Sequence, residues 1–459
     1  MLGDINELPG GDANGVAAQQ LNLKVRKRRN AMRKRQRLAF AATVLAAAVA
    51  FAVITAVVDA AGNSGGLGSG VATNYVKYVE GKAGKANAKL SPIQVGFVNQ
   101  QGGPIVIGAN ATNGAQLAVN YANAALDGID GHPIKFDTCF IASSEAEGTT
   151  CGQKFLSIKG LSVIDEGAVA FGIQSLYRTL GGSRPVMAGV AITPVDAVQK
   201  HTAILFGDGL HVLPPYATYA KTVLHAKTVA DLYENEPGIV PSAQAQIAAL
   251  KADGINVTSA SYPPTETDVI TPLTSAKAAS ADMVIVNTDA NGCVNMANAL
   301  TQVGVTDPKK IVANPLCLNA QVLSALGDFP KWTYGIASSL DGDTSDKGVA
   351  PYVAVAKKYG DGANAPDPWN IVNFGVMIST IKFLNEVANK YGVSGINPAR
   401  VLAAAKAFKG PQALGAPSLS CGKFKTAPAV CNDRAQFFSY AGKGVFTKSA
   451  GWLEGPKGT

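Results

Sequence analysis

The 459-residue chain has only four histidines and six cysteines, and neither residue type is spaced as metal ligands usually are. The sequence contains no CxxC and no HxxxH pattern, whereas structural zinc sites need closely grouped Cys and His ligands. It also lacks the P-loop and HExxH patterns, and its Ser, His and Asp residues form no local arrangement typical of nucleophilic catalysis. We therefore expect no metal, no cofactor and no enzymatic activity.

Outside the N-terminal tail the chain has little net positive charge. Nine Lys and Arg residues against three acidic residues precede Leu38, so the tail carries +6 of the formal net charge of +8 and the rest of the chain carries +2. A nucleic-acid-binding protein would gather its basic residues on the folded domain. The charge distribution therefore excludes nucleic acid as a partner and favours contact of residues 24–37 with anionic lipid headgroups.

The chain has a long hydrophobic run of 21 uncharged residues between Leu38 and Val58. As a helix this run would extend roughly 30 Å, the thickness of the hydrocarbon core of a bilayer. Basic residues on its N-terminal side predict a cytoplasmic tail over residues 1–37 and an extracytoplasmic location for everything after Asp59. The run therefore predicts a single-pass membrane anchor over residues 38–58.

Two other ways of leaving the cytoplasm compete with this anchor. A signal peptide cleaved after Ala60 would explain the small residues around Asp59, but signal sequences have apolar regions of about 7 to 15 residues, shorter than this one. A lipoprotein anchor is excluded because no cysteine precedes Cys139. In the anchor and the signal-peptide interpretations alike, the main part of the chain is exported.

An even number of cysteines in an exported chain predicts disulfides, although six cysteines allow fifteen pairings. Proximity in the sequence favours three local bridges, each worth about 2–4 kcal/mol. These bridges are Cys139–Cys151, Cys293–Cys317 and Cys421–Cys431.

Residues 59–90, rich in Gly, Asn, Ser and Lys, predict a flexible tether with a reach of roughly 30 Å and one short helix over residues 71–80. After the tether, short apolar runs alternate with helical periodicity, which predicts parallel α/β sheets. The expected strands are 93–98, 134–136, 168–171, 186–188, 203–205, 228–232, 257–261, 283–287 and 310–313, and the chain closes with a helix over 369–391 and a hairpin over 436–446.

This length of βα units exceeds one core, so we expect two doubly wound α/β lobes with a cleft between them. The expected lobe 1 comprises residues 91–208 and 337–397, and the expected lobe 2 together with the closing segments of the chain comprises residues 209–336 and 398–459.

Three stretches carry a resemblance to a known family. They are VNQQGGPIVIGANATNGA at 98–115, DGIDGHPIKFD at 127–137, and YPPTETDV at 262–269 before ADMVIV at 281–286. In this order and spacing they resemble the branched-chain amino acid (Leu/Ile/Val) substrate-binding proteins of ABC importers, which have the type I periplasmic binding fold. The resemblance implies two lobes joined by three crossover strands, hinge closure over a small ligand, and delivery of that ligand to ABC permease subunits.

Ligands bind outside the carboxyl ends of strands in such sheets, which points to specific loops. In the expected lobe 1 the candidate ligand-binding residues are Asn99, Gln100, Gln174, Ser175, Ala191 and Thr193. The resemblance implies that the Ser175 and Thr193 hydroxyls, with nearby amides, bind the α-carboxylate of the ligand. The alternative is that both residues only cap helices.

The sequence departs from the family where the ligand side chain and ammonium group would lie. Ile107 and Pro237 stand at positions that the family fills with aromatic residues, and Leu316 stands near its acidic residue. These differences argue against a standard α-amino acid. The missing negative charge could come from the lobe 2 loop residues Glu234, Glu236 or Asp289, for which a solvated position is the alternative.

The combined evidence predicts a membrane-anchored, extracytoplasmic solute-binding protein that delivers a small polar ligand, amino-acid-like or an amide, to an ABC importer. The alternative is a ligand-sensing ectodomain of the same fold that signals through a partner protein. A cytoplasmic tail of 37 residues is too short for a kinase domain, so sensing would require another protein.

Overall fold

The computed structural model describes residues 72–103, 108–360, 362 and 367–457. The expected cytoplasmic tail, the expected membrane helix and the first part of the expected tether lie outside these residues, as does Ile107. The account below concerns the unit from Ser69 to Thr459.

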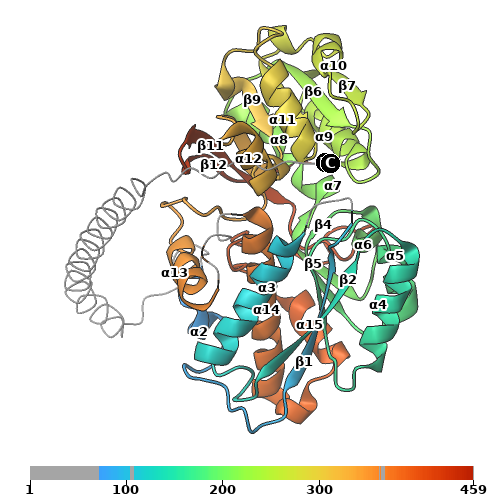
Figure 1. The fold of residues 1–459 in the computed structure, drawn as a ribbon, viewed down its shortest axis with the longest axis vertical. Coiled ribbons are helices and arrows are strands. Elements are labelled where there is room, and N and C mark those ends of the chain that lie inside the picture. Colours follow the sequence, from blue (N-terminus) through green and yellow to red (C-terminus); the bar gives the residue numbers. More distant parts are fainter. Residues whose placement is uncertain (1–71, 104–107, 361, 363–366, 458–459) are drawn as a thin grey trace, which may run out of the picture. The chain divides into compact units, whose positions relative to one another are not determined.

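Lobe 1 is built on a five-stranded parallel sheet with the strand order β2-β1-β3-β4-β5 (Figure 1). The strands are β1 Ile93–Gln100, β2 Ile134–Ile141, β3 Ile164–Glu166, β4 Val186–Ala191 and β5 Thr202–Asp208. Its helices are α2 Tyr75–Tyr78, α3 Ala109–Ala125, α4 Glu145–Ser157, α5 Ile173–Leu180, α6 Pro194–Ala197, α13 Val349–Tyr359, α14 Pro368–Tyr391, η5 Val393–Gly395 and α15 Pro398–Ala407.

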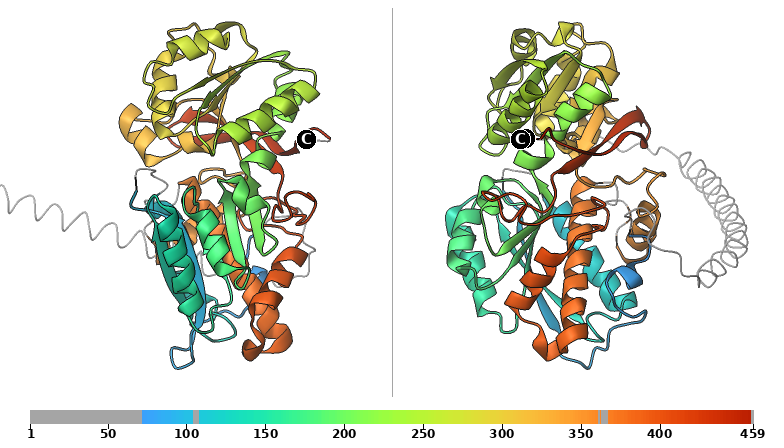
Figure 2. Two further views of the ribbon diagram at one scale, coloured as in Figure 1. Left: turned by 90° about the vertical axis from the view of Figure 1, so that its right-hand side faces the viewer. Right: turned by 180° about the vertical axis from the view of Figure 1, so that it is seen from behind.

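Lobe 2 is built on a seven-stranded sheet with the order β12-β11-β10-β9-β8-β6-β7. The strands are β6 Thr228–Glu234, β7 Asn256–Tyr262, β8 Met283–Asn287, β9 Ile311–Ala313, β10 Thr333–Ile336, β11 Arg434–Gly442 and β12 Val445–Glu454. Its helices are α7 Gly209–Val212, α8 Pro215–Thr222, α9 Val240–Ala252, α10 Ile270–Ser275, η1 Ala278–Ser280, α11 Ala290–Ala299, η2 Pro308–Lys310, η3 Pro315–Cys317 and α12 Ala320–Leu326. The C-terminal hairpin of β11 and β12 adds the antiparallel part of this sheet (Figure 2).

Separate apolar clusters pack against the two faces of the lobe 2 sheet. One cluster joins the sheet to α8 and α9, and another joins it to α10, α11 and α12. Helices on both faces of a mainly parallel sheet define the doubly wound architecture. The predicted fold class, two doubly wound lobes, is therefore confirmed.

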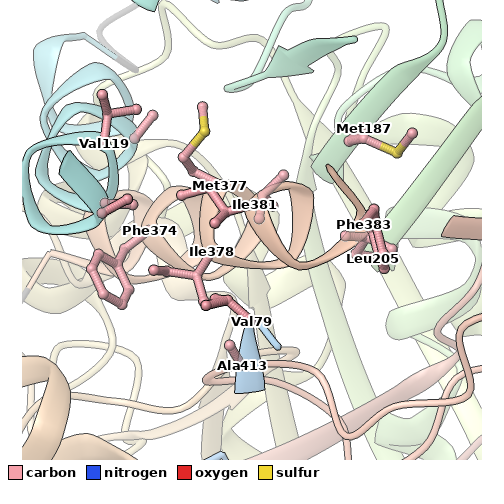
Figure 3. Close-up of a cluster of buried hydrophobic side chains, with 14 of the residues drawn as sticks. Val79, Val119, Met187, Leu205, Phe374, Met377, Ile378, Ile381, Phe383 and Ala413 are labelled. Carbon is pink, nitrogen blue, oxygen red and sulfur yellow. The ribbon is translucent and has the colours of Figure 1, made fainter. Parts of the chain in front are cut away.

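Helix α14 is the central buried helix of lobe 1. Within the described residues it is the helix long and apolar enough to cross a membrane, but 89% of its most apolar stretch is buried inside the protein. Figure 3 shows its side chains packed with residues of α3, β4 and β5. These contacts include Phe374, Met377, Ile378, Ile381 and Phe383 of α14 with Val119, Met187 and Leu205. The helix therefore forms the core of the lobe.

The expected strand over residues 168–171 is wrong, because the third strand of lobe 1 is β3, which starts four residues earlier, at Ile164. Apolar patterning missed it because β3 contains two acidic residues that are almost fully buried, Asp165 and Glu166. Thr380 of α14 donates a hydrogen bond to Asp165 Oδ1 at 2.7 Å. Residues 168–171 form instead a loop at the carboxyl end of this strand.

Two expected boundaries also differ from the structure. Residues 398–431 are expected with lobe 2 and the closing segments of the chain. In the structure α15 and the loop after it pack in the lobe 1 core, and Val430 forms a bridge with Ile204 of β5. The described part of the expected tether, residues 72–90, likewise packs on lobe 1, where Tyr75 and Val79 of the α2 region are buried. These residues belong to the folded unit.

The three predicted disulfides are confirmed. They join Cys139 of β2 to Cys151 of α4, Cys293 of α11 to Cys317 of η3, and Cys421 to Cys431 in the loop that follows α15. Two of the bridges therefore fasten a helix next to the carboxyl end of a strand, one in each lobe.

The chain passes between the lobes three times, after β5, after β10 and before β11. Asn432 Nδ2 donates to the Phe206 and Arg434 carbonyl oxygens, both at 3.0 Å. Gln436 Nε2 donates to the Ser338 carbonyl oxygen at 2.9 Å. The three crossing segments, as the resemblance implied, are thus tied together by hydrogen bonds from buried amide side chains.

Candidate functional site

The parallel strands of lobe 1 end at one edge of the sheet, where six candidate residues were expected. Two of these, Asn99 and Gln100, are fully buried at the end of β1. Asn99 Nδ2 donates to the Gly108 carbonyl oxygen at 2.9 Å, and Gln100 Oε1 accepts from the amides of Ala170 and Phe171 at 2.7 and 3.3 Å. Both side chains therefore hold the loops of this edge in place.

The loop fixed by Gln100 presents an aromatic side chain. Phe171 is 42% exposed although its backbone is held at the carboxyl end of β3. Gly172 follows it with a left-handed φ of 73°, which favours glycine and lets the chain turn into α5.

A carboxylate of the protein itself occupies the N-terminus of α5. Glu145 Oε1 accepts from the Gly172 amide at 3.1 Å, and Glu145 Oε2 accepts from the Ser175 amide at 3.0 Å. Hydrogen bonding by the Ser175 hydroxyl and these amides lowers the pKa of Glu145. Gln174 points a polar side chain to solvent at the same turn, since it is exposed. The donors that the sequence assigned to a ligand carboxylate are therefore engaged with Glu145.

The second predicted carboxylate binder, Thr193, follows the buried Ala191 at the end of β4. Its hydroxyl donates to Asp196 Oδ2 at 2.9 Å. Asp196 and Glu166 are both almost fully buried, and the Tyr177 hydroxyl donates to Glu166 Oε2 at 3.3 Å.

These two acids form a buried pair beneath the Thr193 loop. Burial, followed by the nearby Asp196 charge, raises the pKa of Glu166 well above its usual range, and burial raises the pKa of Asp196 to about 6. Because the two carboxyl groups hydrogen-bond each other in a buried position, ionising both is costly, and the pair shares one proton. The pair places negative charge behind Thr193.

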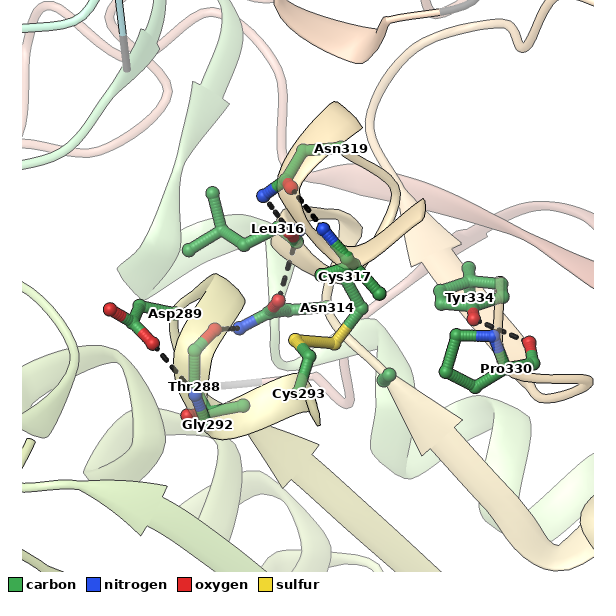
Figure 4. The surroundings of a disulfide bond; sticks show 12 residues. Thr288, Asp289, Gly292, Cys293, Asn314, Leu316, Cys317, Asn319, Pro330 and Tyr334 are labelled. Atoms are coloured by element: carbon green, nitrogen blue, oxygen red, sulfur yellow. Dashed lines mark hydrogen bonds between the residues drawn. A yellow bond between two sulfur atoms is a disulfide. The ribbon is translucent and has the colours of Figure 1, made fainter. Parts of the chain in front are cut away.

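The matching edge of lobe 2 brings together the three acidic residues that the sequence proposed. Glu234 ends β6, and its Oε2 accepts from the Asp289 amide at 2.9 Å. Asp289 is the N-cap of α11, with Oδ1 accepting from the Gly292 amide at 2.9 Å (Figure 4). Burial, together with the charges of Asp289 and Glu236, raises the pKa of Glu234 to about 7. Burial, with Asp289 next, also raises the pKa of Glu236.

The disulfide between Cys293 and Cys317 lies beside this edge. Figure 4 shows that it joins the first turn of α11, just after Asp289, to the turn that contains Leu316. The Leu316 amide donates to Asn314 Oδ1 at 3.0 Å, which fixes the backbone of this turn. The residue at position 316 has an apolar side chain and so provides no acidic group. The acidic group of the site therefore comes from the β6 and β8 ends.

Loops of the two lobes meet where these edges face each other. A Cβ placed on Gly238, in the loop after Glu234, would lie 3.2 Å from Ile192 Cγ2. Ile192 stands between Ala191 and Thr193. The structure therefore brings the Ala191–Thr193 segment of lobe 1 next to the Glu234–Gly238 loop of lobe 2.

Sequence reasoning missed three acidic residues of lobe 1, Glu145, Glu166 and Asp196. The signals that could have found them are weak, because Glu145 resembles any acidic residue in a first helical turn. Its contact with Ser175 joins residues 30 positions apart, and only the packing of α4 on α5 creates it.

Comparisons with known proteins agree with this arrangement. A sequence model of a protein family, described as "Periplasmic binding protein", matches residues 92–427. No curated protein sequence matches the chain significantly.

Solved structures share the fold at low identity. The substrate-binding protein LivJ of a branched-chain amino acid transporter from Streptococcus pneumoniae, in complex with isoleucine, is 18% identical, with a TM-score of 0.61 over 78% of this chain and 100% of that one. An R. palustris ABC transporter solute-binding protein in complex with 4-hydroxybenzoate is 16% identical, with a TM-score of 0.63 over 80% and 99%. A fatty acid ABC transporter substrate-binding protein from Thermomonospora curvata is 12% identical, with a TM-score of 0.61 over 82% and 95%.

Proposed function

Because the chain belongs to the periplasmic binding protein family, we propose that it is a membrane-anchored, extracytoplasmic solute-binding protein that delivers a small ligand to an ABC importer. The family match confirms the resemblance found in the sequence and implies an extracytoplasmic location. Amino-acid-like molecules and amides are the starting candidates for the ligand. Binding and release, rather than catalysis, are the proposed activity.

The observation that carries this proposal is the opposition of two polar strand edges. The Ile192 and Gly238 loops meet between the lobes, with Thr193 on one side and Glu236 on the other. Clefts between domains at the carboxyl ends of parallel strands are the usual ligand sites of α/β proteins. The hydrogen-bonded crossing segments around Asn432 and Gln436 would serve as the hinge.

The anchor forms part of the proposal. The hydrophobic run from Leu38 to Val58 would hold the binding domain at the membrane, close to the permease. Three disulfides suit an oxidising, extracytoplasmic compartment. Since residues 72–90 pack on lobe 1, they would not add to the reach of the expected tether.

A thermal-shift experiment tests the binding function. The fragment to use is residues 69–459, because a fragment beginning at residue 90 would remove the buried Tyr75 and Val79. The compounds are amino acids, amides, amines and short carboxylates, added after dialysis of the partly unfolded protein to remove bound solute. A ligand at about one hundred times its Kd should stabilise the fold by about 2.7 kcal/mol and raise the melting temperature.

The outcome that contradicts the proposal is a melting temperature that no compound in any class changes. Transport is tested separately, by crosslinking the full-length protein in membranes with and without ligand. The importer role predicts a ligand-dependent crosslink to permease subunits. A ligand-dependent crosslink to a signalling protein instead would favour a sensory role.

A further inference from the structure

The two lobes differ in which groups they leave free for a ligand carboxylate and for a ligand ammonium group. In lobe 1, the donors for a carboxylate are already bound. Glu145 already fills the α5 N-terminus, with its two oxygens 3.1 Å from the Gly172 amide and 3.0 Å from the Ser175 amide. A ligand carboxylate would have to displace Glu145 from two amides and a hydroxyl that it binds as an anion. Helix N-termini attract anions only while their amides are free.

The Thr193 hydroxyl is unavailable as well. It donates to Asp196 Oδ2, and the buried pair of Asp196 and Glu166 lies behind it. A ligand carboxylate at Thr193 would therefore meet negative charge at close range in a poorly solvated position, where like charges repel strongly. Neither of the two hydroxyls that the resemblance assigns to a ligand carboxylate is free in lobe 1.

Lobe 2 has the complementary property. The charges that act on Glu234 are those of Asp289 and Glu236, and the charge that acts on Glu236 is that of Asp289. None of the ion pairs within the described part of the chain includes any of these three carboxylates. Among the described residues, Asp289 and Glu236 therefore have no basic partner at this edge of lobe 2, and the raised pKa of the buried Glu234 favours its neutral form until a cation binds nearby.

A second observation at this edge concerns a buried oxygen. Glu234 is 0% exposed, and among the described residues its Oε1 has no donor other than the Thr288 side chain, whose hydrogen bond lowers the pKa of Glu234. Its other oxygen binds the amide of Asp289, whose own side chain is only half-buried. A buried carboxylate with only these two donors and two acidic neighbours is costly, and a cation bound against Asp289 and Glu236 would offset that cost.

Lobe 1 adds an aromatic ring to this charge pattern. Phe171 is exposed at the strand edge, on a loop that Gln100 fixes. The face of a phenylalanine ring attracts ammonium groups and does nothing for carboxylates. Both lobes thus present groups that favour a cation.

We infer that the ligand of this cleft is a small cationic amine that carries no carboxylate. The inference rests on the proposed solute-binding function and narrows its ligand class. Glu236 and Asp289 contact the ammonium group, Glu234 adds charge beneath them, Phe171 covers the apolar side, and Glu145 excludes carboxylates from the α5 N-terminus.

Matched pairs of amino acids and their decarboxylated amines test this inference directly. The pairs are leucine with 3-methylbutylamine, lysine with cadaverine, ornithine with putrescine, and arginine with agmatine. Binding is measured by calorimetry and thermal shift on the full-length protein in a nonionic detergent. In at least one pair, we expect the amine to bind at least about tenfold more tightly than its parent amino acid, and more weakly as salt is added.

Two outcomes overturn the inference in distinguishable ways. If an amino acid binds as tightly as its amine, or if only amides or carboxylates bind, the ligand class is wrong while the solute-binding function stands. If no compound of any class binds, both the ligand class and the proposed function fail.

Two variants test the assigned residues. Glu145→Ala should raise the affinity for the parent amino acid at least about tenfold, because it frees the Gly172 and Ser175 amides. Glu236→Gln should lower the amine affinity about tenfold without changing the melting temperature of the ligand-free protein, because Glu236 is partly exposed.

Glu386→Ala is the matched control, since it removes one partly exposed carboxylate from α14, outside the cleft. It should change neither affinity. A Glu145→Ala protein that still does not bind amino acids would overturn the role of Glu145. An unchanged amine affinity in the Glu236→Gln protein would overturn the cation site.

Discussion

The carboxyl edges of the two lobes have the same backbone architecture but differ in how many hydrogen-bond donors their carboxylates have. In lobe 1, Glu145 has two amides and a hydroxyl as donors, and these hydrogen bonds lower its pKa. In lobe 2, burial and neighbouring carboxylates raise the pKa of Glu234. Donors that already bind a carboxylate of the protein are not free for a ligand carboxylate, whereas an edge with more carboxylates than donors attracts a cation.

The largest effect that tests this comparison comes from the disulfides, since each lobe has one bridge at its edge. Replacing both cysteines of Cys139–Cys151 or of Cys293–Cys317 by serine should destabilise the protein by about 3 kcal/mol in either case. The second pair holds the first turn of α11, next to Asp289. Its loss should also lower the affinity for the ligand, while loss of the first pair should not.

Urea denaturation and calorimetric binding on the two double variants measure these effects. Each bridge is the control for the other, because the stability losses are matched. Equal loss of affinity in both variants would show that the edges do not differ in their contribution to binding.

A smaller effect concerns one buried aspartate in each lobe, Asp165 in β3 and Asp231 in β6. Burial raises the pKa of each to about 8. The unfolded chain releases these protons near pH 4 and the folded protein retains them, so stability should fall as the pH rises from about 4 to about 8. Asp165→Asn and Asp231→Asn should each stabilise the protein by about 2 kcal/mol at pH 8 and have no effect at pH 4.

The two aspartates differ in their hydrogen bonds, and this difference sharpens the comparison. Thr380 donates to Asp165 at 2.7 Å, whereas Asn287 Nδ2 lies 3.4 Å from Asp231 and 2.5 Å from Gln246 Oε1. We expect the larger gain from Asp231→Asn, because Asp231 has the poorer donor. Melting temperatures at pH 4, 6 and 8 check the sign, and a gain that does not depend on pH would exclude titration as its cause.

The smallest expected effect concerns the aromatic ring of lobe 1. Phe171→Leu should weaken binding of a cationic ligand by about 1 kcal/mol, since leucine retains apolar contact and loses the ring face. Phe171→Tyr is the matched control and should retain the affinity. Equal affinities of the Leu and wild-type proteins for the ligand, measured by calorimetry, would confine Phe171 to an apolar role.

Hydrophobic periodicity in the sequence predicts most of the helices and strands, and it fails where polar residues are buried. Strand β1 and helix α14 follow from apolar patterns that are complete within the local sequence. Strand β3 does not, because Asp165 and Glu166 look like surface residues until their partners on α14, α5 and α6 are known. The assignment of α15 to lobe 1 likewise depends on contacts with α14 and β5.

Local sequence determined the properties that depend on neighbours in the chain: the hydrophobic run between Leu38 and Val58, the alternation of strands and helices, and the short-range pairing of cysteines such as Cys139 and Cys151. Tertiary structure alone decided the character of the cleft. Whether Ser175 is free for a ligand depends on Glu145, and the charge around Glu234 depends on Asp289, which is 55 residues away in the sequence. Electrostatic interactions act over a few ångströms in space, so the sign of a binding site emerges only when the chain has folded.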